Sequence, residues 1–253
     1  MARRCLVTGG GTGIGAGIAA RLAAAGHRVA VLGRRGEPLE RTVAALAADG
    51  LEAVAEVGDI TDERGIAVAV DRVADRLGGL DVLVNNAGAG GPNACAADGP
   101  ERWDTIVRTN VDGTFFATRA ALAHLPDGGR IVNISSVLGR FGVPGYTAYC
   151  ASKHAVIGFT KALALELAER RITVNAICPG WVETEMAREG MELMARGMSV
   201  SYEEARRTAL GAVPLGRILE PEEIGEHVAW LCSDGAAGMT GQAIVHDGGQ
   251  IMW

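Results

Sequence analysis

Short apolar runs alternate with longer amphipathic ones along most of the 253-residue chain. The short runs are rich in valine and apolar throughout, as in strands that are covered by helices on both faces. The longer runs carry apolar residues at helical spacing. The pattern predicts strands over 5–7, 29–32, 53–57, 81–84, 130–134, 173–177 and 243–245, and helices over 13–25, 37–48, 62–77, 102–124, 148–169 and 222–232.

Strands and helices in this order form repeated β-α-β units. They predict an α/β fold of three layers, a doubly wound parallel sheet of the Rossmann type. Because no linker or repeat divides the chain, we expect a single domain over residues 1–253. The segment 183–215 breaks the rhythm with four methionines and several glycines. We expect it to form a small helical lid over the site.

Charge and composition exclude several functions. The formal net charge is -6, with no basic run, so nucleic-acid binding is not expected. No apolar stretch is long enough to cross a bilayer, so no membrane contact is expected either. The five cysteines are scattered, which favours a reducing cytoplasm over a disulfide-bonded secreted protein. The histidines lack metal-ligand spacing, so no metal site is expected.

A glycine-rich run from Thr8 to Gly15 lies between the first predicted strand and the first helix. Glycines allow a tight turn and a close approach of the backbone to a pyrophosphate. The helix that follows offers free N–H groups and a partial positive charge. Such a run by itself is also found in ordinary turns, but its place after the first strand of a β-α-β chain favours dinucleotide binding.

The second predicted strand is followed by Gly33, Arg34 and Arg35. An acidic residue at this point binds the ribose 2′-hydroxyl of NAD, whereas an arginine suits the 2′-phosphate of NADP. The sequence therefore predicts NADP(H). The alternative is that both arginines are simply solvated.

Tyr149 and Lys153 are four residues apart, so their side chains share one face of the predicted helix. A nearby ammonium group and the positive nicotinamide ring both favour the phenolate and lower the phenol's pKa from its ordinary value of about 10. The pair therefore has a physical reason to exchange protons. Taken alone, it would more often be a pair on a helix surface.

Other polar residues support the catalytic interpretation. Ser136 follows a buried strand, and Asn85 to Gly88 follow another, so both lie at the edge where parallel sheets bind ligands. Asn110 lies inside a predicted helix, where asparagine is a poor choice. It is either a mild helix defect or a functional contact to a water or to the lysine.

Together these residues resemble the short-chain dehydrogenase/reductase family. The match comprises T-G-x-x-x-G-x-G at Thr8 to Gly15, Asp59, N-N-A-G at Asn85 to Gly88, Asn110, Ser136, Tyr149 with Lys153, P-G-x-x-x-T at Pro179 to Thr184, and Asp247-Gly248-Gly249. It covers essentially the whole chain in order.

The resemblance implies four catalytic residues. Tyr149 would protonate a carbonyl oxygen or deprotonate an alcohol, and Lys153 would lower its pKa and bind the nicotinamide ribose. Ser136 would orient the substrate oxygen, and Asn110 would hold a water of a proton relay through Lys153. The residues expected to bind the cofactor are Thr8, Gly9, Thr12, Gly13, Ile14, Gly15, Arg34, Arg35, Asp59, Ile60, Asn86, Ala87, Gly88, Tyr149, Lys153, Pro179, Gly180, Val182 and Thr184.

Within the family, the segments 149–154, 179–184, 200–205 and 213–217 resemble bacterial aromatic-polyketide ketoreductases. Those enzymes reduce a carrier-bound ketone with NADPH. The segment Ala89 to Asn93 departs from their Pro-Gly-Gly pattern, which puts stereochemistry and substrate fit in question. We expect an apolar substrate, small or carrier-bound, to contact Leu138, Phe141, Val143, Trp181, Met186, Met191 and Met194. The methionines could equally serve to pack a helix onto the core. The resemblance also implies a homotetramer built through the helices near Asn110 and Tyr149.

Three functions compete on this sequence. The first is a biosynthetic ketone reductase that uses NADPH. The second is a catabolic alcohol dehydrogenase or a 3-oxoacyl reductase with the same residues. The third is a silent cofactor-binding regulator, which the presence of all four catalytic residues disfavours.

Overall fold

The structure is a computed structural model that describes residues 2–97 and 99–252. Seven strands form its sheet, each within two residues of its predicted bounds. They are β1 (Arg4–Thr8), β2 (Arg28–Gly33), β3 (Ala53–Val57), β4 (Val82–Asn85), β5 (Arg130–Ile134), β6 (Thr173–Pro179) and β7 (Ala243–His246).

Nine α-helices accompany these strands within the described residues. They are α1 (Gly13–Ala24), α2 (Gly36–Ala48), α3 (Glu63–Leu77), α4 (Pro100–Val107), α5 (Gly113–Leu122), α6 (Thr147–Glu166), α7 (Glu185–Met198), α8 (Tyr202–Gly211) and α9 (Pro221–Leu231). Short 3-10 turns cover Val137–Gly139, Ala168–Arg170 and Asp234–Ala236.

All strand pairs are parallel, in the order β3-β2-β1-β4-β5-β6-β7. The direction of the order reverses between β1 and β4, which makes this a doubly wound sheet. Such sheets bind ligands outside the carboxyl ends of the strands near that reversal. The predicted fold class is confirmed.

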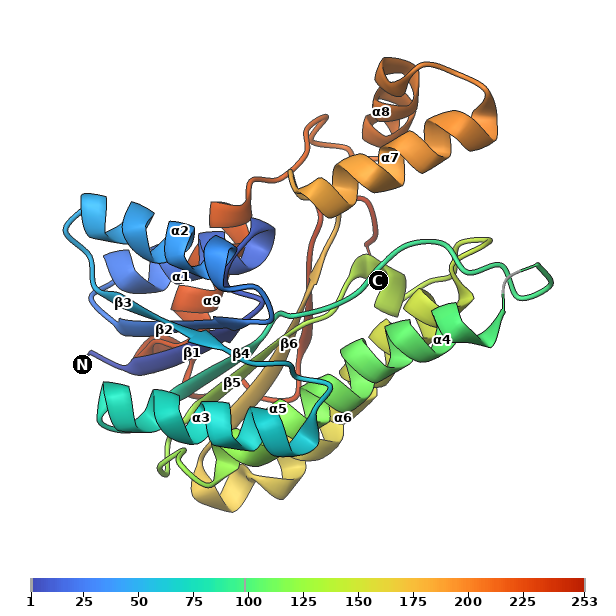
Figure 1. The fold of residues 1–253 in the computed structure, drawn as a ribbon. Helices are drawn as coiled ribbons and strands as arrows, with labels where there is room; N and C mark the ends of the chain where they lie inside the picture. Colours follow the sequence, from blue (N-terminus) through green and yellow to red (C-terminus); the bar gives the residue numbers. More distant parts are fainter. Residues whose placement is uncertain (1, 98, 253) are drawn as a thin grey trace.

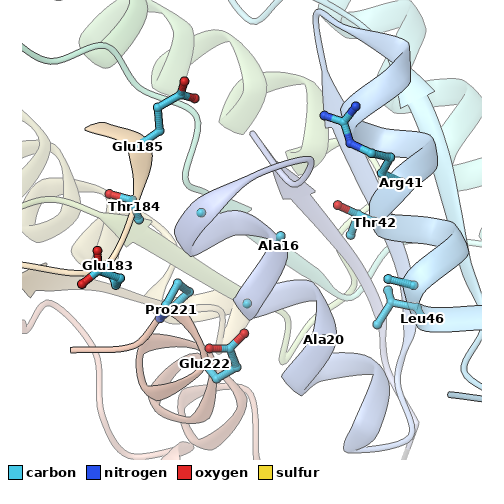
Figure 2. Close-up of a pocket in the computed structure, with 13 residues that line it drawn as sticks. Ala16, Ala20, Arg41, Thr42, Leu46, Glu183, Thr184, Glu185, Pro221 and Glu222 are labelled. Atoms are coloured by element: carbon cyan, nitrogen blue, oxygen red, sulfur yellow. The ribbon is translucent and has the colours of Figure 1, made fainter. Parts of the chain in front are cut away.

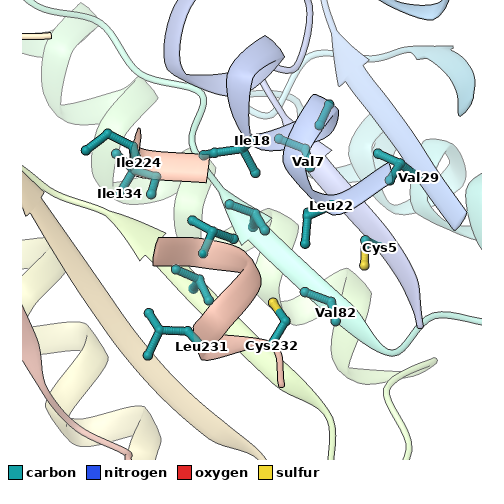
Figure 3. Packing of buried hydrophobic residues seen from close by; sticks show 14 of the residues in the cluster. Cys5, Val7, Ile18, Leu22, Val29, Val82, Ile134, Ile224, Leu231 and Cys232 are labelled. Atoms are coloured by element: carbon teal, nitrogen blue, oxygen red, sulfur yellow. The ribbon is translucent and has the colours of Figure 1, made fainter. Parts of the chain in front are cut away.

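Helices cover both faces of the sheet, α1, α2 and α9 on one and α3, α5 and α6 on the other (Figure 1). Each face has its own core. Figure 3 shows the first, in which Ile18 and Leu22 of α1 and Ile224 of α9 pack on the valines of β1 and β4. Cys5 and Cys232 belong to this core, and burial raises the pKa of the Cys232 thiol to about 12. These two cysteines therefore act as apolar fillers.

The predicted helix over 102–124 is interrupted. A π-helical turn, Arg108–Asp112, separates α4 from α5 and contains Asn110, which is only 1% exposed. The Thr114 hydroxyl donates to the Asn110 carbonyl oxygen (2.8 Å). A π-helical turn inserts an extra residue and is frequent at functional sites. Asn110 is thus accommodated by a change of helix type, which the sequence pattern did not predict.

The helices α7 and α8 lie in the segment 183–215, which is expected to form the lid, and extend beyond the carboxyl edge of the sheet (Figure 1). Ser201 caps α8 through a capping box with Glu204. Met191 is 1% exposed and packs with Ala209 and Ile218. The lid therefore has a small core of its own.

Arg217 and Glu223 form a two-pronged ion pair, with N–O distances of 2.6 and 2.7 Å, at the start of α9. This pair holds the pKa of Glu223 at about 2, below its ordinary value. Glu223→Gln should lower the free energy of unfolding at pH 7 by up to about 1 kcal/mol. The loss should shrink between pH 4.5 and 2, because a carboxyl with a depressed pKa stabilises the fold only above that window. Denaturant unfolding of Glu223→Gln and of the control Glu222→Gln measures this loss. Equal stability of the two variants at pH 7 would contradict the prediction.

Among the described residues, no helix is both long and apolar enough to cross a membrane.

Candidate active site

The polar residues at the carboxyl ends of the central strands lie where the sequence places them. Thr8 ends β1, Asn85 ends β4, Ser136 follows β5 and Pro179 ends β6. Tyr149 and Lys153 lie on the first two turns of α6, which begins after the loop that follows Ser136. One edge of the sheet therefore carries both the glycine-rich turn and the acid/base residues.

The glycine-rich turn closely contacts the loop that follows strand β4. Gly9 has φ +65°, and a Cβ atom there would lie 2.8 Å from the Cα of Ala87. A Cβ on Gly15 would collide with the carbonyl of Gly9. Larger residues would displace the turn, so the glycines are needed for its shape.

The N-terminus of α1 is open for an anion. The Thr12 side chain makes no capping hydrogen bond, and φ is +51° at Gly13. No partner outside the helix is found for the amides of Gly13, Ile14 and Gly15 within the described residues. Free N–H groups at a helix N-terminus fit a pyrophosphate, so the turn fits a dinucleotide.

Thr8 and Asn86 brace this turn. The Thr8 hydroxyl accepts from the amides of Asn86 (3.0 Å) and Ala87 (3.1 Å), and the Asn86 Nδ2 donates to the carbonyls of Thr8 (3.0 Å) and Gly9 (3.2 Å). The side-chain amide hydrogens of Asn86 thus serve the turn itself, rather than pointing freely to an adenosine.

Arg34 and Arg35 are exposed at the end of β2 and the start of α2. Within the described chain, no carboxylate pairs with either guanidinium. Unpaired guanidinium groups at this point are available for a phosphate.

Asp59 and Ile60 lie in the loop after β3. The Asp59 carboxylate accepts from the amide (2.9 Å) and hydroxyl (2.8 Å) of Thr61. Ile60 is buried, and a Cβ on Gly113 would collide with its side chain. This contact links the loop after β3, where the adenine is expected to bind, to the start of α5 next to the π-helical turn of Asn110.

Tyr149 is partly exposed, and Ser136, 9% exposed, lies beside it. Burial raises the pKa of Tyr149 to about 12, and a hydrogen bond with Ser136 opposes this rise. The phenol is therefore protonated at neutral pH.

Lys153 is 5% exposed, and its Nζ donates to the carbonyl of Ile134 (2.9 Å). The Nζ lies 5.6 Å from the ring centroid of Tyr149. Burial lowers the pKa of Lys153 to about 8. It remains mostly an ammonium at neutral pH.

In the chain alone, burial outweighs the expected lowering of the Tyr149 pKa, and the net shift is upward. The Lys153 ammonium lies near the ring of Tyr149 and donates a hydrogen bond to the Ile134 carbonyl. Loss of solvation is therefore the main influence on the pKa of the phenol. A phenol that keeps its proton is suited to donate it.

Asn110 connects three parts of the site. Its Oδ1 accepts from the amide of Ala89 (2.7 Å), and its Nδ2 donates to the Ala89 carbonyl and to the Ser152 hydroxyl (both 2.9 Å). The Ser152 hydroxyl in turn donates to the Tyr149 carbonyl (2.8 Å). The side chain thus positions the segment after N-N-A-G against the catalytic helix.

Sequence reasoning missed Ser152 and Asn93 as positioning residues. Asn93 is 3% exposed; its amide donates to the Gly145 carbonyl (2.6 Å), and its side chain accepts from the Thr147 hydroxyl (2.9 Å). The signal for Ser152 was its place between Tyr149 and Lys153. Asn93 gave no signal beyond the departure of its segment from the family pattern.

Comparisons with known proteins agree with this geometry. Residues 9–250 match the profile of the family described as "Enoyl-(Acyl carrier protein) reductase". A Streptomyces coelicolor protein named "Putative ketoacyl reductase" is 46% identical over 96% of this chain and 95% of its own. The 3-oxoacyl-[acyl-carrier-protein] reductase of Thermotoga maritima is 38% identical, over 98% and 97%. A solved variant of actinorhodin polyketide ketoreductase with NADPH superimposes with a TM-score of 0.94, at 44% identity and 99% coverage of both chains.

This chain belongs to the short-chain dehydrogenase/reductase family. The resemblance stated from its motifs is confirmed, and the protein is an oxidoreductase of that family.

In this short-chain dehydrogenase/reductase, the residues after β6 lie between the sheet and the lid. A Cβ on Gly180 would lie 2.7 Å from that of Asp247, whose carboxylate accepts from the amides of Gly249 (2.8 Å) and Ile251 (2.7 Å). Val182 is buried and pairs with Leu219, and Thr184 caps α7.

The seven residues expected to contact substrate fall into three groups. Leu138, Phe141 and Val143 lie partly exposed in the loop between Ser136 and α6. Met186, 47% exposed, contacts Gly90 at the base of the lid. Trp181, Met191 and Met194 pack in the lid core. Met191 therefore serves packing, as the alternative expected, but within the lid and not against the main core.

A pocket of about 530 Å³ lies beside the cofactor turn (Figure 2). Its floor is the small-residue face of α1, including Ala16 and Ala20, and its walls carry Thr42, Thr184 and Pro221. Of the residues expected to bind the cofactor, Gly13 and Thr184 line it, and none of the four expected catalytic residues does. It is therefore distinct from the catalytic centre.

The described residues contain no cluster of three or more histidine, cysteine or acidic side chains suited to a metal ion.

Proposed function

We propose that this protein is an NADPH-dependent ketoreductase that converts an apolar, polyketide-type ketone to a secondary alcohol. The observation that carries this proposal is the placement of Tyr149 beside Ser136 and Lys153, at the edge that also carries the glycine-rich turn. The resemblance to ketoreductases named for NADPH and for polyketides supports it.

Each residue of the site has a separate role in the proposed reaction. The turn from Thr8 to Gly15 and the arginines Arg34 and Arg35 bind the cofactor, which supplies a hydride when bound. The Ser136 hydroxyl orients the ketone oxygen. Tyr149 donates a proton to that oxygen as negative charge develops on it. Lys153 keeps positive charge beside the phenol and favours the phenolate that remains.

Ketone reduction should lose rate at alkaline pH. Because burial lowers the pKa of Lys153 to about 8, its ammonium is lost above that pH, whereas Tyr149 keeps its proton until about 12. We expect kcat/KM for the ketone to fall above pH 8, approaching roughly tenfold per pH unit. Initial rates of NADPH oxidation from pH 6.5 to 10 test this. A flat profile up to pH 10 would mean that Lys153 carries no such charge.

The substrate class can be tested with a panel of ketones. We expect turnover of a bicyclic ketone such as trans-1-decalone, because Leu138 and Phe141 are partly exposed and Met186 is 47% exposed, so their apolar side chains are available to such a substrate. Small cyclic ketones, an aryl ketone and an acetoacetyl thioester complete the panel. NADPH oxidation is the readout, and the bicyclic ketone should have the highest kcat/KM.

The panel also distinguishes the second candidate. The similarity to a 3-oxoacyl-[acyl-carrier-protein] reductase favours a short carrier-bound substrate as the alternative. A clear preference for the acetoacetyl thioester would support that function. Turnover only of alcohols with NAD would instead point to a catabolic dehydrogenase. No turnover of the panel, with NADPH still bound, would show that the proposed substrate class is wrong.

We also propose a homotetramer in the cytoplasm. Trp103 of α4 and Phe115 of α5 are 41% and 46% exposed, and Phe115 contacts Phe159 of α6. Exposed aromatic side chains on adjacent helices favour an interface there. Light scattering at micromolar concentration should give four subunits, and Phe115→Glu should reduce the mass while Leu193→Glu in the lid leaves it unchanged. A monomeric wild type would contradict the proposal.

A further inference from the structure

A second pocket, of about 520 Å³, opens at the opposite edge of the sheet, where the strands begin. Arg3 precedes β1, Arg130 begins β5, and Thr173 begins β6; Gly128, Arg171 and Asp234 complete its polar lining. We call it the arginine pocket. Arg130 and Ser136 are separated by the length of β5, roughly 20 Å at strand spacing, so the pocket is remote from the catalytic residues.

Arg130 is a buried cation that has no carboxylate partner among the described residues. It is 4% exposed, and its Nη1 donates to the carbonyls of Gly128 (2.6 Å) and Gly129 (3.1 Å). Its Nε is buried and finds no hydrogen-bond partner in that same part of the chain. Burial, followed by the charge of Arg3, lowers the pKa of Arg130. Buried charges are normally paired, because an unpaired one loses its hydration without compensation.

Of the other charges, Asp234 attracts Arg130 but forms no direct ion pair with it in the described part of the chain. Arg3 pairs with Asp234 (3.1 Å), whose side chain is 86% exposed. The side chain of Arg171 is exposed and has neither an ion pair nor a hydrogen bond within 2–97 and 99–252. Three guanidinium groups thus face one solvated carboxylate, in a protein whose net charge is -6.

We propose that the arginine pocket binds a small organic or inorganic anion with two or more negatively charged oxygens. Its volume is within the range of small-molecule sites. Guanidinium groups bind carboxylate and phosphate oxygens through paired hydrogen bonds. The anion would contact Arg3 and Arg171 at the mouth and compensate Arg130 at the floor. Polycarboxylates and polyphosphates share this chemistry.

Thermal unfolding with citrate or pyrophosphate tests the proposal. Saturating NADPH fills the cofactor's phosphate sites, and KCl keeps the ionic strength constant. We expect a saturable rise of several degrees in the unfolding temperature. If citrate gives this rise at the lower concentration, the ligand is a polycarboxylate. If pyrophosphate does, the ligand is a polyphosphate.

Matched variants locate the binding. Arg171→Gly suits the backbone, since φ is +54° at this residue, and should weaken binding at least about tenfold. Arg171→Lys should restore part of it, and Arg64→Ala on α3 should bind as the wild type does. Arg130→Met should abolish the shift in unfolding temperature. If Arg130→Met does not fold, Arg171→Gly still decides the test. No shift with either probe, an equal shift in Arg171→Gly, or a shift that NADPH removes would overturn the proposal.

Discussion

Tyr149→Phe should lower kcat for ketone reduction by about 10²–10⁴-fold. The variant removes only the phenolic oxygen, which burial keeps protonated by raising the pKa of Tyr149 to about 12. NADPH affinity should change little, since the turn from Thr8 to Gly15 remains intact. Steady-state NADPH oxidation with a bicyclic ketone, together with fluorescence titration of NADPH, measures both effects.

Tyr146→Phe is the matched control for this prediction. Tyr146 also has a pKa raised by burial, and it lies one turn earlier at the start of α6. It should keep nearly wild-type kcat. If Tyr149→Phe retained half of the wild-type kcat, or if Tyr146→Phe lost as much, Tyr149 could not be the proton donor.

The double variant Arg34→Ala, Arg35→Ala should lose most of its preference for NADPH. Each lost charge-assisted hydrogen bond to a 2′-phosphate is worth about 1.5–3 kcal/mol. We therefore expect kcat/KM for NADPH to fall on the order of 10²-fold or more. Both side chains are exposed and unpaired within the described chain, so their removal should not destabilise the fold.

NADH provides the internal control, because it lacks the 2′-phosphate. Its kcat/KM should stay within about twofold of the wild-type value, as removing surface side chains of this kind has small effects elsewhere. A wild type that prefers NADH, or equal losses with both nucleotides, would show that these arginines do not select the cofactor.

The sequence predicted the sheet well because the patterns that indicate strands and helices lie within short stretches of the chain. Valine-rich runs and helical spacing placed every strand, and the order of the elements implied parallel crossovers. The π-helical turn at Asn110 was not predictable in this way. It depends on Thr114, Ala89 and Ser152, which the fold brings together from separate elements.

The candidate site was predicted by residue type but not by environment. The motif placed Tyr149 and Lys153 on one helix face, as the structure has them. The direction of the Tyr149 pKa shift could not be read from their spacing, because burial and the bond of Lys153 to Ile134 come from tertiary packing. Likewise, the enclosure of Met191 depends on α8, whose docking onto α7 is not encoded in the methionine pattern.

Transfer of deuterium tests the central claim most directly. The enzyme would be incubated with NADPH that is deuterated at the reactive nicotinamide carbon, and with trans-1-decalone. The account predicts that the isolated alcohol carries deuterium at the carbinol carbon, and that Tyr149→Phe forms this product at most at a small fraction of the wild-type rate. Alcohol without deuterium, or equal formation by Tyr149→Phe, would contradict it.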